Sequence, residues 1–341
     1  MNFYSFTRGC LFLLGLITAG FSSAKTPLTT DGSNKRDPVF IDGGATLVYG
    51  VDENRDLIRL RQLDLDTLES KPYYESANRH HVEVAFSGDG RYISYTECTG
   101  NLTAQFVIKD LQDKKDYFVK HSGRGGTRSP AFAPDNSVVV YAFAEKGPQQ
   151  LWSVDMEAKN KKQLTQCEGI SNWPSFTPNG KTIVFSNTRE NNYEIYSMDA
   201  NGSNEKRLTE NTIMDIRPVV SPNGKQIAFT SLRNGFYNVY VMNVDGAKVR
   251  QVTDSEERDD YPTWHPDGRR LAIVSERKGM LISTWWKFPL PVRSRRNVNC
   301  GLIDVCFPLL ERAKPASSLR VVDVPYPPPF GRGSANLIRF T

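Results

Sequence analysis

One eleven-residue pattern recurs along the chain and restricts its fold more than any other feature. It reads TPNGKTIVFSN at Thr177–Asn187, SPNGKQIAFTS at Ser221–Ser231 and HPDGRRLAIVS at His265–Ser275. An Asn-Gly or Asp-Gly turn followed by apolar residues that alternate with small or polar ones is typical of a β-hairpin. The sequence therefore predicts antiparallel hairpins that repeat along the chain.

The turn residue of this pattern returns at a regular interval. It falls at Asp42, Asp89, Asp135, Asn179, Asn223 and Asp267, with spacings of 47, 46, 44, 44 and 44 residues. A period of about 40–50 residues is typical of propellers, in which each repeat is one four-stranded blade. We therefore predict an all-β fold, a six-bladed β-propeller of four-stranded antiparallel blades. In the third repeat Asn136 replaces the glycine, and asparagine tolerates the positive φ angle of this turn.

The fourth repeat shows the expected anatomy of one blade most clearly. Its strands should be WPSF from Trp173, KTIVFSN from Lys181, YEIYSMD from Tyr193 and EKRLTE from Glu205. These runs are short, alternate with a period of two and are separated by turn residues. No stretch after Ala24 has a strong helical period, which argues against the α/β classes.

The first residues of the predicted propeller resemble the end of a blade. PLTTDGSNKRDPVF at Pro27–Phe40 matches RQVTDSEERDDYPTW at Arg250–Trp264, where a fourth strand leads into the next first strand. The last repeat begins at Asp259, and LISTWW after Met280 can supply its third strand. We expect residues near Pro27–Thr30 to supply its fourth strand, which closes the ring and removes an exposed sheet edge.

The two ends of the chain differ from the repeats. Arg8 precedes the apolar run Cys10–Phe21, and Ser22 and Ala24 have the small side chains that signal peptidase prefers. We predict a signal peptide over residues 1–24, a propeller over 25–286 and a periplasmic or secreted protein with no stable membrane span after cleavage. The alternative is an uncleaved anchor, although the run is short for a span.

Residues 287–341 form a proline-rich basic tail in this prediction, either disordered or an aberrant sequence. From Leu281 onward there are nine Lys or Arg and three Asp or Glu, which accounts for the net charge of +5. Because the basic residues lie outside the repeats, we predict no nucleic-acid partner. The remaining cysteines, Cys98, Cys167, Cys300 and Cys306, fit no zinc pattern, and the sequence leaves their disulfide pairing open.

The segment PSFTPNGKTIVFSNTRENNYEIYSMDANGSNEKRLT, residues 174–209, resembles the WD40-like repeats of the TolB family. The pattern is nearly whole in the units at Trp173 and Arg217, partial at Tyr261 and weaker in the earlier units, and it covers about Pro27–Met280. The resemblance implies a cell-envelope propeller with protein-interaction surfaces. Because the predicted propeller begins directly after the predicted signal peptide, we expect this chain to lack the α/β domain that precedes the propeller in TolB itself.

The sequence contains no recognisable catalytic pattern. It has no G-x-S-x-G elbow, no Asp-box repeat and no metal-ligand spacing, and its repeated Asp and Asn residues are those that tight turns require. We therefore predict a non-catalytic protein without a cofactor or a metal.

The most variable positions of the repeats lie around the start of each first strand. The residue at the position directly before the first-strand proline is Asp37, Glu83, Ser129, Trp173, Arg217 or Tyr261, and two positions earlier it is Lys35, His81, Thr127, Ser171, Asp215 or Asp259. Loops on a rigid scaffold often carry function, and Trp, Tyr and Arg anchor interfaces. We predict a binding site in the loops of the channel mouth, formed by Asp37, Glu83, Trp173, Asp215, Arg217, Asp259 and Tyr261. The alternative is that these are ordinary solvated loop residues.

These features predict an exported, monomeric scaffold that binds an envelope protein or an extended peptide. One alternative is a propeller enzyme, a polysaccharide lyase or hydrolase or a peptidase-related protein. It would use the channel as its cleft, with Glu83, Asp215, Asp259 and His81 as acids and bases. Another is an interaction domain whose partner binds the sides of the blades.

Overall fold

The computed structural model describes residues 26–54, 57–74, 79–99, 103–122, 126–277 and 280–287, which all belong to one unit, Met1–Pro291. The predicted signal peptide lies outside these residues, as do the tail after Lys287 and the cysteines Cys300 and Cys306. Among the described residues, Cys98 and Cys167 are free cysteines. No helix among the described residues has the length and apolar character needed to cross a membrane.

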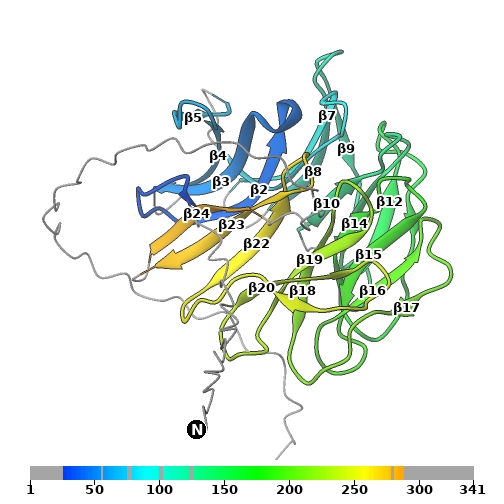
Figure 1. The fold of residues 1–341 in the computed structure, drawn as a ribbon. Helices are drawn as coiled ribbons and strands as arrows, with labels where there is room; N and C mark the ends of the chain where they lie inside the picture. Colours follow the sequence, from blue (N-terminus) through cyan, green and yellow to red (C-terminus); the bar gives the residue numbers. More distant parts are fainter. Residues whose placement is uncertain are drawn as a thin grey trace, which may run out of the picture. The chain divides into compact units, whose positions relative to one another are not determined.

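Five four-stranded antiparallel sheets are each built from consecutive strands (Figure 1). The first contains β2 (Lys35–Ile41), β3 (Thr46–Asn54), β4 (Leu57–Asp64) and β5 (Ser70–Pro72), with the short 3-10 turn η1 (Asp42–Gly44) between β2 and β3. The second contains β6 (His80–Phe86), β7 (Tyr92–Thr99), β8 (Thr103–Asp110) and β9 (Lys115–Val119). The third contains β10 (Arg128–Phe132), β11 (Val139–Phe143), β12 (Gln150–Val154) and β13 (Lys162–Gln163).

The next two sheets follow the same order along the chain. The fourth contains β14 (Ser171–Phe176), β15 (Thr182–Asn187), β16 (Glu194–Asp199) and β17 (Lys206–Arg207). The fifth contains β18 (Asp215–Val220), β19 (Gln226–Ser231), β20 (Asn238–Asn243) and β21 (Arg250–Gln251). The prediction of an all-β propeller with four-stranded antiparallel blades is confirmed.

A further sheet combines strands from both ends of the described chain. Its order is β1-β24-β23-β22, with β22 (Asp259–Trp264), β23 (Arg270–Arg277), β24 (Met280–Lys287) and β1 (Thr26–Pro27). Thr26 pairs with Trp285 and Pro27 with Thr284 in an antiparallel register. The first strands of successive sheets contact one another, and β22 contacts both β18 and β2. Here we call β2, β6, β10, β14, β18 and β22 the first strands.

The core lies between neighbouring sheets, and the second strands show why. Along β11, Tyr141 and Phe143 pack with Phe106 and other residues of the second sheet. The alternate residues Val140 and Ala142 pack with residues of the fourth sheet. Because successive side chains of a strand point to opposite faces, a strand between two neighbours must be apolar on both. This accounts for the nearly continuous apolar runs that follow the turns.

Candidate functional site

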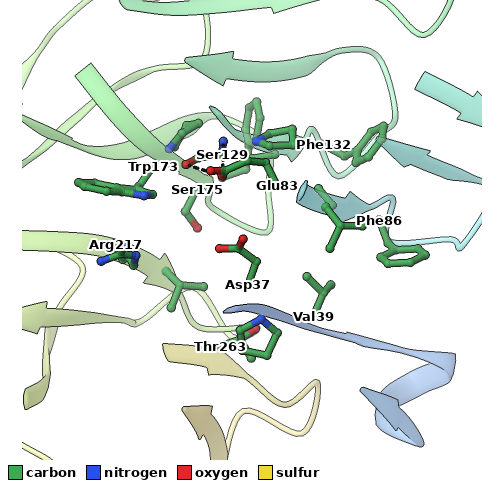
Figure 2. Close-up of a pocket in the computed structure, with 18 of the residues that line it drawn as sticks. Asp37, Val39, Glu83, Phe86, Ser129, Phe132, Trp173, Ser175, Arg217 and Thr263 are labelled. Atoms are coloured by element: carbon green, nitrogen blue, oxygen red, sulfur yellow. Dashed lines mark hydrogen bonds between the residues drawn. The ribbon is translucent and has the colours of Figure 1, made fainter. Parts of the chain in front are cut away.

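The first strands surround a cavity of about 460 Å³. Figure 2 shows its side chains converging from several strands on one space. The lining runs from the residue before each first-strand proline to the turns after the first strands, where Gly88 and Pro134 line it. The cavity is therefore bounded by equivalent positions of successive repeats.

Each first strand contains a β-bulge at the edge of this cavity. The pairing of β2 with β3, for example, shifts register between Arg36 and Val39, and that of β18 with β19 shifts between Ile216 and Val219. The bulged position has a positive φ in every case: Asp37 48°, Glu83 56°, Ser129 48°, Trp173 51°, Arg217 52° and Tyr261 52°. We call these six the bulge residues. Five are followed by proline, which has no N–H group to lose from the interrupted ladder.

Five of the seven residues predicted for the site are bulge residues that line the cavity: Asp37, Glu83, Trp173, Arg217 and Tyr261. They lie within the first strands, so the prediction that they occupy channel-mouth loops is wrong in that respect. The bulge explains the difference, because it gives a residue inside a strand the backbone freedom usually associated with a turn.

Asp215 and Asp259 are not among the lining residues, and their predicted place at the channel mouth is wrong. Both are fully buried. Asp215 Oδ2 accepts hydrogen bonds from Arg233 at 2.6 Å and Asn211 at 2.9 Å, and Asp259 Oδ1 accepts one from the Ser275 hydroxyl at 2.6 Å. Residues two apart in a regular strand face the same way, but the bulge interrupts that alternation.

The acid and base set of the enzymatic alternative is not assembled in the cavity. Of Glu83, Asp215, Asp259 and His81, only Glu83 lines it. His81 is buried against Tyr74 and Tyr95, with ring centroids 5.4 and 4.7 Å apart, and burial lowers the pKa of its imidazole. The position two residues before each bulge is buried in every repeat, which indicates a role in packing.

Arg217 contacts side chains of both neighbouring first strands. Its guanidinium carbon lies 4.9 Å from the ring centroid of Trp173 and 4.1 Å from that of Tyr261, within cation–π range of both. Its Nη1 donates to both carboxylate oxygens of Asp260, at 3.2 and 3.1 Å. Arg217 thus links three first strands, β14, β18 and β22.

Asp260 is not among the site residues predicted from the sequence. It follows another aspartate and precedes a bulge residue, and nothing in that local sequence distinguishes it. Its carboxylate is almost fully buried and also accepts hydrogen bonds from Arg258 and from the Thr230 hydroxyl. Burial acts to raise the pKa of Asp260, but Arg217 and Arg258 outweigh it and hold that pKa below its usual value.

Asp37 stands in contrast to the other two carboxylates near the cavity. Glu83 pairs with Arg128 at 3.0 Å and accepts a hydrogen bond from the Ser129 amide at 2.9 Å. The Asp37 carboxylate has no hydrogen bond or ion pair within the described part of the chain. Burial, reinforced by the nearby Glu83 charge, raises the pKa of Asp37 to about 7, although Arg217 and Arg36 oppose the change.

Apart from the bulge residues, Ser175 and Thr263, the cavity wall is apolar. Val39, Phe86, Phe132, Phe176 and Val219 line it, and we call these five residues the apolar collar. Figure 2 shows Val39 and Phe86 on one side of the cavity and Arg217 on the other. The arrangement can therefore accept a group with an apolar stem and a polar head. No cluster of His, Cys, Asp and Glu suited to a metal ion occurs among the described residues.

Comparison with protein families matches the chain to the TolB beta propeller domain over residues 44–231 and 210–282. The two segments together include more than half of the chain. No curated protein sequence matches it.

Solved structures with the same architecture include TolB proteins and an enzyme. A TolB-type protein from Agrobacterium tumefaciens is 23% identical, with a TM-score of 0.55 over 63% of this chain and 76% of its own. TolB from Acinetobacter baumannii is 19% identical, with a TM-score of 0.59 over 72% of this chain and 65% of its own. An oligogalacturonate lyase from Vibrio parahaemolyticus is 14% identical, with a TM-score of 0.54 over 80% of this chain and 95% of its own. At these identities the likeness shows the fold.

Proposed function

The chain belongs to the TolB β-propeller domain family, and from that membership we propose that it is a non-catalytic scaffold that binds a protein or an extended peptide in its central cavity. The observation that carries the proposal is the set of bulge residues. A left-handed conformation costs a non-glycine residue about 1 kcal/mol, and strain of this kind gathers at functional sites. Six such residues meet around one cavity and differ in charge and size while the backbone repeats.

The scaffold in this proposal is a closed six-bladed ring. The sheet β1-β24-β23-β22 supplies the sixth blade, and its contacts with β2 and β18 support that assignment. His265 supports it too, because its ring lies 5.1 Å from Phe40 and its Nε2 lies 3.3 Å from the Gly44 carbonyl.

Leu28, directly after β1, tests the closure. It is buried with Leu47 and Tyr49 of the first sheet and Ala272 of the last. Leu28→Ala should lower the free energy of unfolding by about 2–4 kcal/mol in urea, as expected for a core residue. A loss below about 0.5 kcal/mol, typical of a surface position, would contradict a closed ring.

The proposed setting is the periplasm or the cell exterior, with the mature protein monomeric from Lys25 onward. The apolar run Cys10–Phe21 supports export, and the TolB resemblance supports an envelope partner. An enzymatic role has less support, because the carboxylate of Glu83 is already engaged by Ser129 and Arg128.

The experiment is affinity capture from an envelope extract with two matched glycine variants. Ser129→Gly/Trp173→Gly removes two cavity side chains while glycine keeps the left-handed backbone. Leu68→Gly/Lys114→Gly makes the same change at two left-handed residues in turns outside the cavity lining. A specific partner should be retained by the wild type and the control and lost by the cavity variant, provided all three give the same circular dichroism. Retention by all three would contradict binding in the cavity.

A further inference from the structure

The carboxylate of Asp37 is the one charged group of the cavity wall that has no direct partner among the described residues. Glu83 is paired with Arg128, and Arg217 with Asp260. Figure 2 shows the Asp37 carboxylate pointing into the space between Arg217, Glu83 and Val39. An ionised carboxylate in such a cavity without a counter-charge is costly, so it either takes up a proton or favours a ligand that brings a positive charge.

The charged and titratable groups that face Asp37 come from four first strands. They are Arg36 of its own strand β2, Glu83 of β6, Arg217 of β18, and Asp260 and Tyr261 of β22. The guanidinium of Arg217 is shared with Asp260, and Arg36 donates to Asp52 at 2.8 Å. Both cations near Asp37 therefore pair with other carboxylates, and neither forms an ion pair with Asp37.

The wall next to Asp37 determines which cation fits. The apolar collar lines the same cavity as Asp37, so a group whose head lies at the carboxylate can place its stem against apolar side chains. A lysine side chain has four methylene groups and a compact ammonium head with three donors. Arginine would favour stacking on aromatic faces, but Arg217 already covers Trp173 and Tyr261.

We propose that the cavity binds a lysine side chain of the partner, with its ammonium group at the Asp37 carboxylate and its methylene stem against the apolar collar. This inference rests on the proposed function and adds the chemistry of the group that enters the cavity. The bound ammonium supplies the counter-charge that the described residues leave missing, and Glu83 adds to the negative potential on the same side.

Binding of the ammonium should displace a proton from Asp37. With a pKa of about 7 the free carboxyl is mostly protonated at pH 6 and mostly ionised at pH 8. A nearby cation favours the ionised form and lowers that pKa, so affinity should rise with pH. The lysine head remains charged throughout, since its ordinary pKa is about 10.4. The expected gain between pH 6 and pH 8 is about tenfold.

The experiment measures binding of three small probes to the mature protein by isothermal titration calorimetry. The probes are N-acetyl-lysine methylamide, its uncharged counterpart N-acetyl-norleucine methylamide, and N-acetyl-glutamate methylamide. The variant is Asp37→Asn, which keeps the size of the side chain and suits a left-handed residue because asparagine tolerates positive φ. The matched control is Asp66→Asn, at an exposed carboxylate outside the cavity lining.

The lysine probe should bind at least about tenfold more tightly than the norleucine probe, and about tenfold more tightly at pH 8 than at pH 6. Asp37→Asn should remove both differences, and Asp66→Asn should change neither. Equal binding of lysine and norleucine by the wild type would overturn the proposal. Preferential binding of the glutamate probe would also overturn the proposal, and it would indicate that Arg217 binds the ligand's carboxylate.

The proposed function can survive that failure. If the glycine variant Ser129→Gly/Trp173→Gly loses the captured partner while the lysine probe shows no preference, the cavity binds a partner by other chemistry. If Asp37→Asn loses the preference for the lysine probe, its affinity for the captured partner should also fall at least about tenfold at pH 8.

Discussion

Two sets of left-handed residues recur in the repeats, one at the bulges within the first strands and one in the turns that follow them, and they differ in how the sequence accommodates them. The turns after the first strands use Gly90, Asn136, Gly180, Gly224 and Gly268, residue types that adopt positive φ at little cost. The bulges use Asp, Glu, Ser, Trp, Arg and Tyr at similar φ angles. Positive φ therefore costs little free energy in the turns, where it only reverses the chain, and more in the bulges, where the residue lines the cavity.

The comparison separates architecture from function within one repeat. A turn position needs only a residue that tolerates positive φ, and it is glycine in every repeat except the third, which has Asn136. A bulge position must present a particular side chain to a shared space, so it varies from blade to blade. Six bulges at about 1 kcal/mol each are a sizeable part of the 5–15 kcal/mol that typically holds a domain together.

The largest expected effect comes from the residue that holds the bulge residues together. Asp260→Ala leaves the guanidinium groups of Arg217 and Arg258 without their shared carboxylate. The free energy of unfolding should fall by roughly 3 kcal/mol in urea, because a buried ion pair loses one partner. Asp66→Asn is the control, and a loss below about 1 kcal/mol for Asp260→Ala would show that the network is not structural.

The next prediction concerns Asp37 and pH. The folded protein holds this proton up to about pH 7, whereas an unfolded aspartate releases it near pH 4. Between these values the folded state binds more protons, so this group makes the wild type less stable as pH rises. The asparagine side chain does not titrate, so the free energy of unfolding of Asp37→Asn should rise relative to that of the wild type by on the order of 1–3 kcal/mol from pH 5 to pH 8 in urea unfolding. A constant difference would contradict the raised pKa.

A turn glycine should show a smaller and purely structural effect. Gly224 has a φ of 69°, and a Cβ there would lie 3.3 Å from the Pro178 side chain of the preceding turn. Gly224→Ala should cost about 1–2 kcal/mol in urea unfolding. Gly90→Ala, with a φ of 73° and no neighbour within 4 Å, should cost less. Equal costs would show that contact between successive turns contributes nothing, and neither variant should alter probe binding.

The smallest effect should be a gain in stability at a bulge. Ser129→Gly removes left-handed strain, and Ser129→Ala keeps it, while both remove the same hydroxyl. The glycine variant should be more stable than the alanine variant by about 0.5–1 kcal/mol in paired thermal and urea unfolding. If alanine is the more stable of the two, the bulge conformation is not strained.

The turns could be predicted because their chemistry is local. Asn-Gly and Asp-Gly favour tight hairpins, and the expectation for Asn136 is confirmed by its φ of 56°. The varied bulge positions could also be found, because five of the seven predicted site residues line the cavity.

The remaining features depend on tertiary structure. No glycine or asparagine identifies Trp173 or Tyr261 as left-handed, since the strand pairing around them imposes that conformation. The sequence predicts Asp215 and Asp259 at the mouth because their positions vary near the start of each first strand, and it does not reveal the bulge that separates them from the lining residues. The Arg217–Asp260 pair joins residues 43 positions apart, a contact that only the arrangement of neighbouring sheets creates.

The most direct test is hydroxyl-radical footprinting of the mature protein with and without the captured partner. Phe86 and Trp173 report on the cavity, and Leu68 and Phe118, which are 50% and 46% exposed, report on residues outside its lining. A ligand site in the cavity predicts that the partner protects Phe86 and Trp173 and leaves Leu68 and Phe118 unchanged. Protection confined to Leu68 and Phe118 would place the partner outside the cavity and contradict the account.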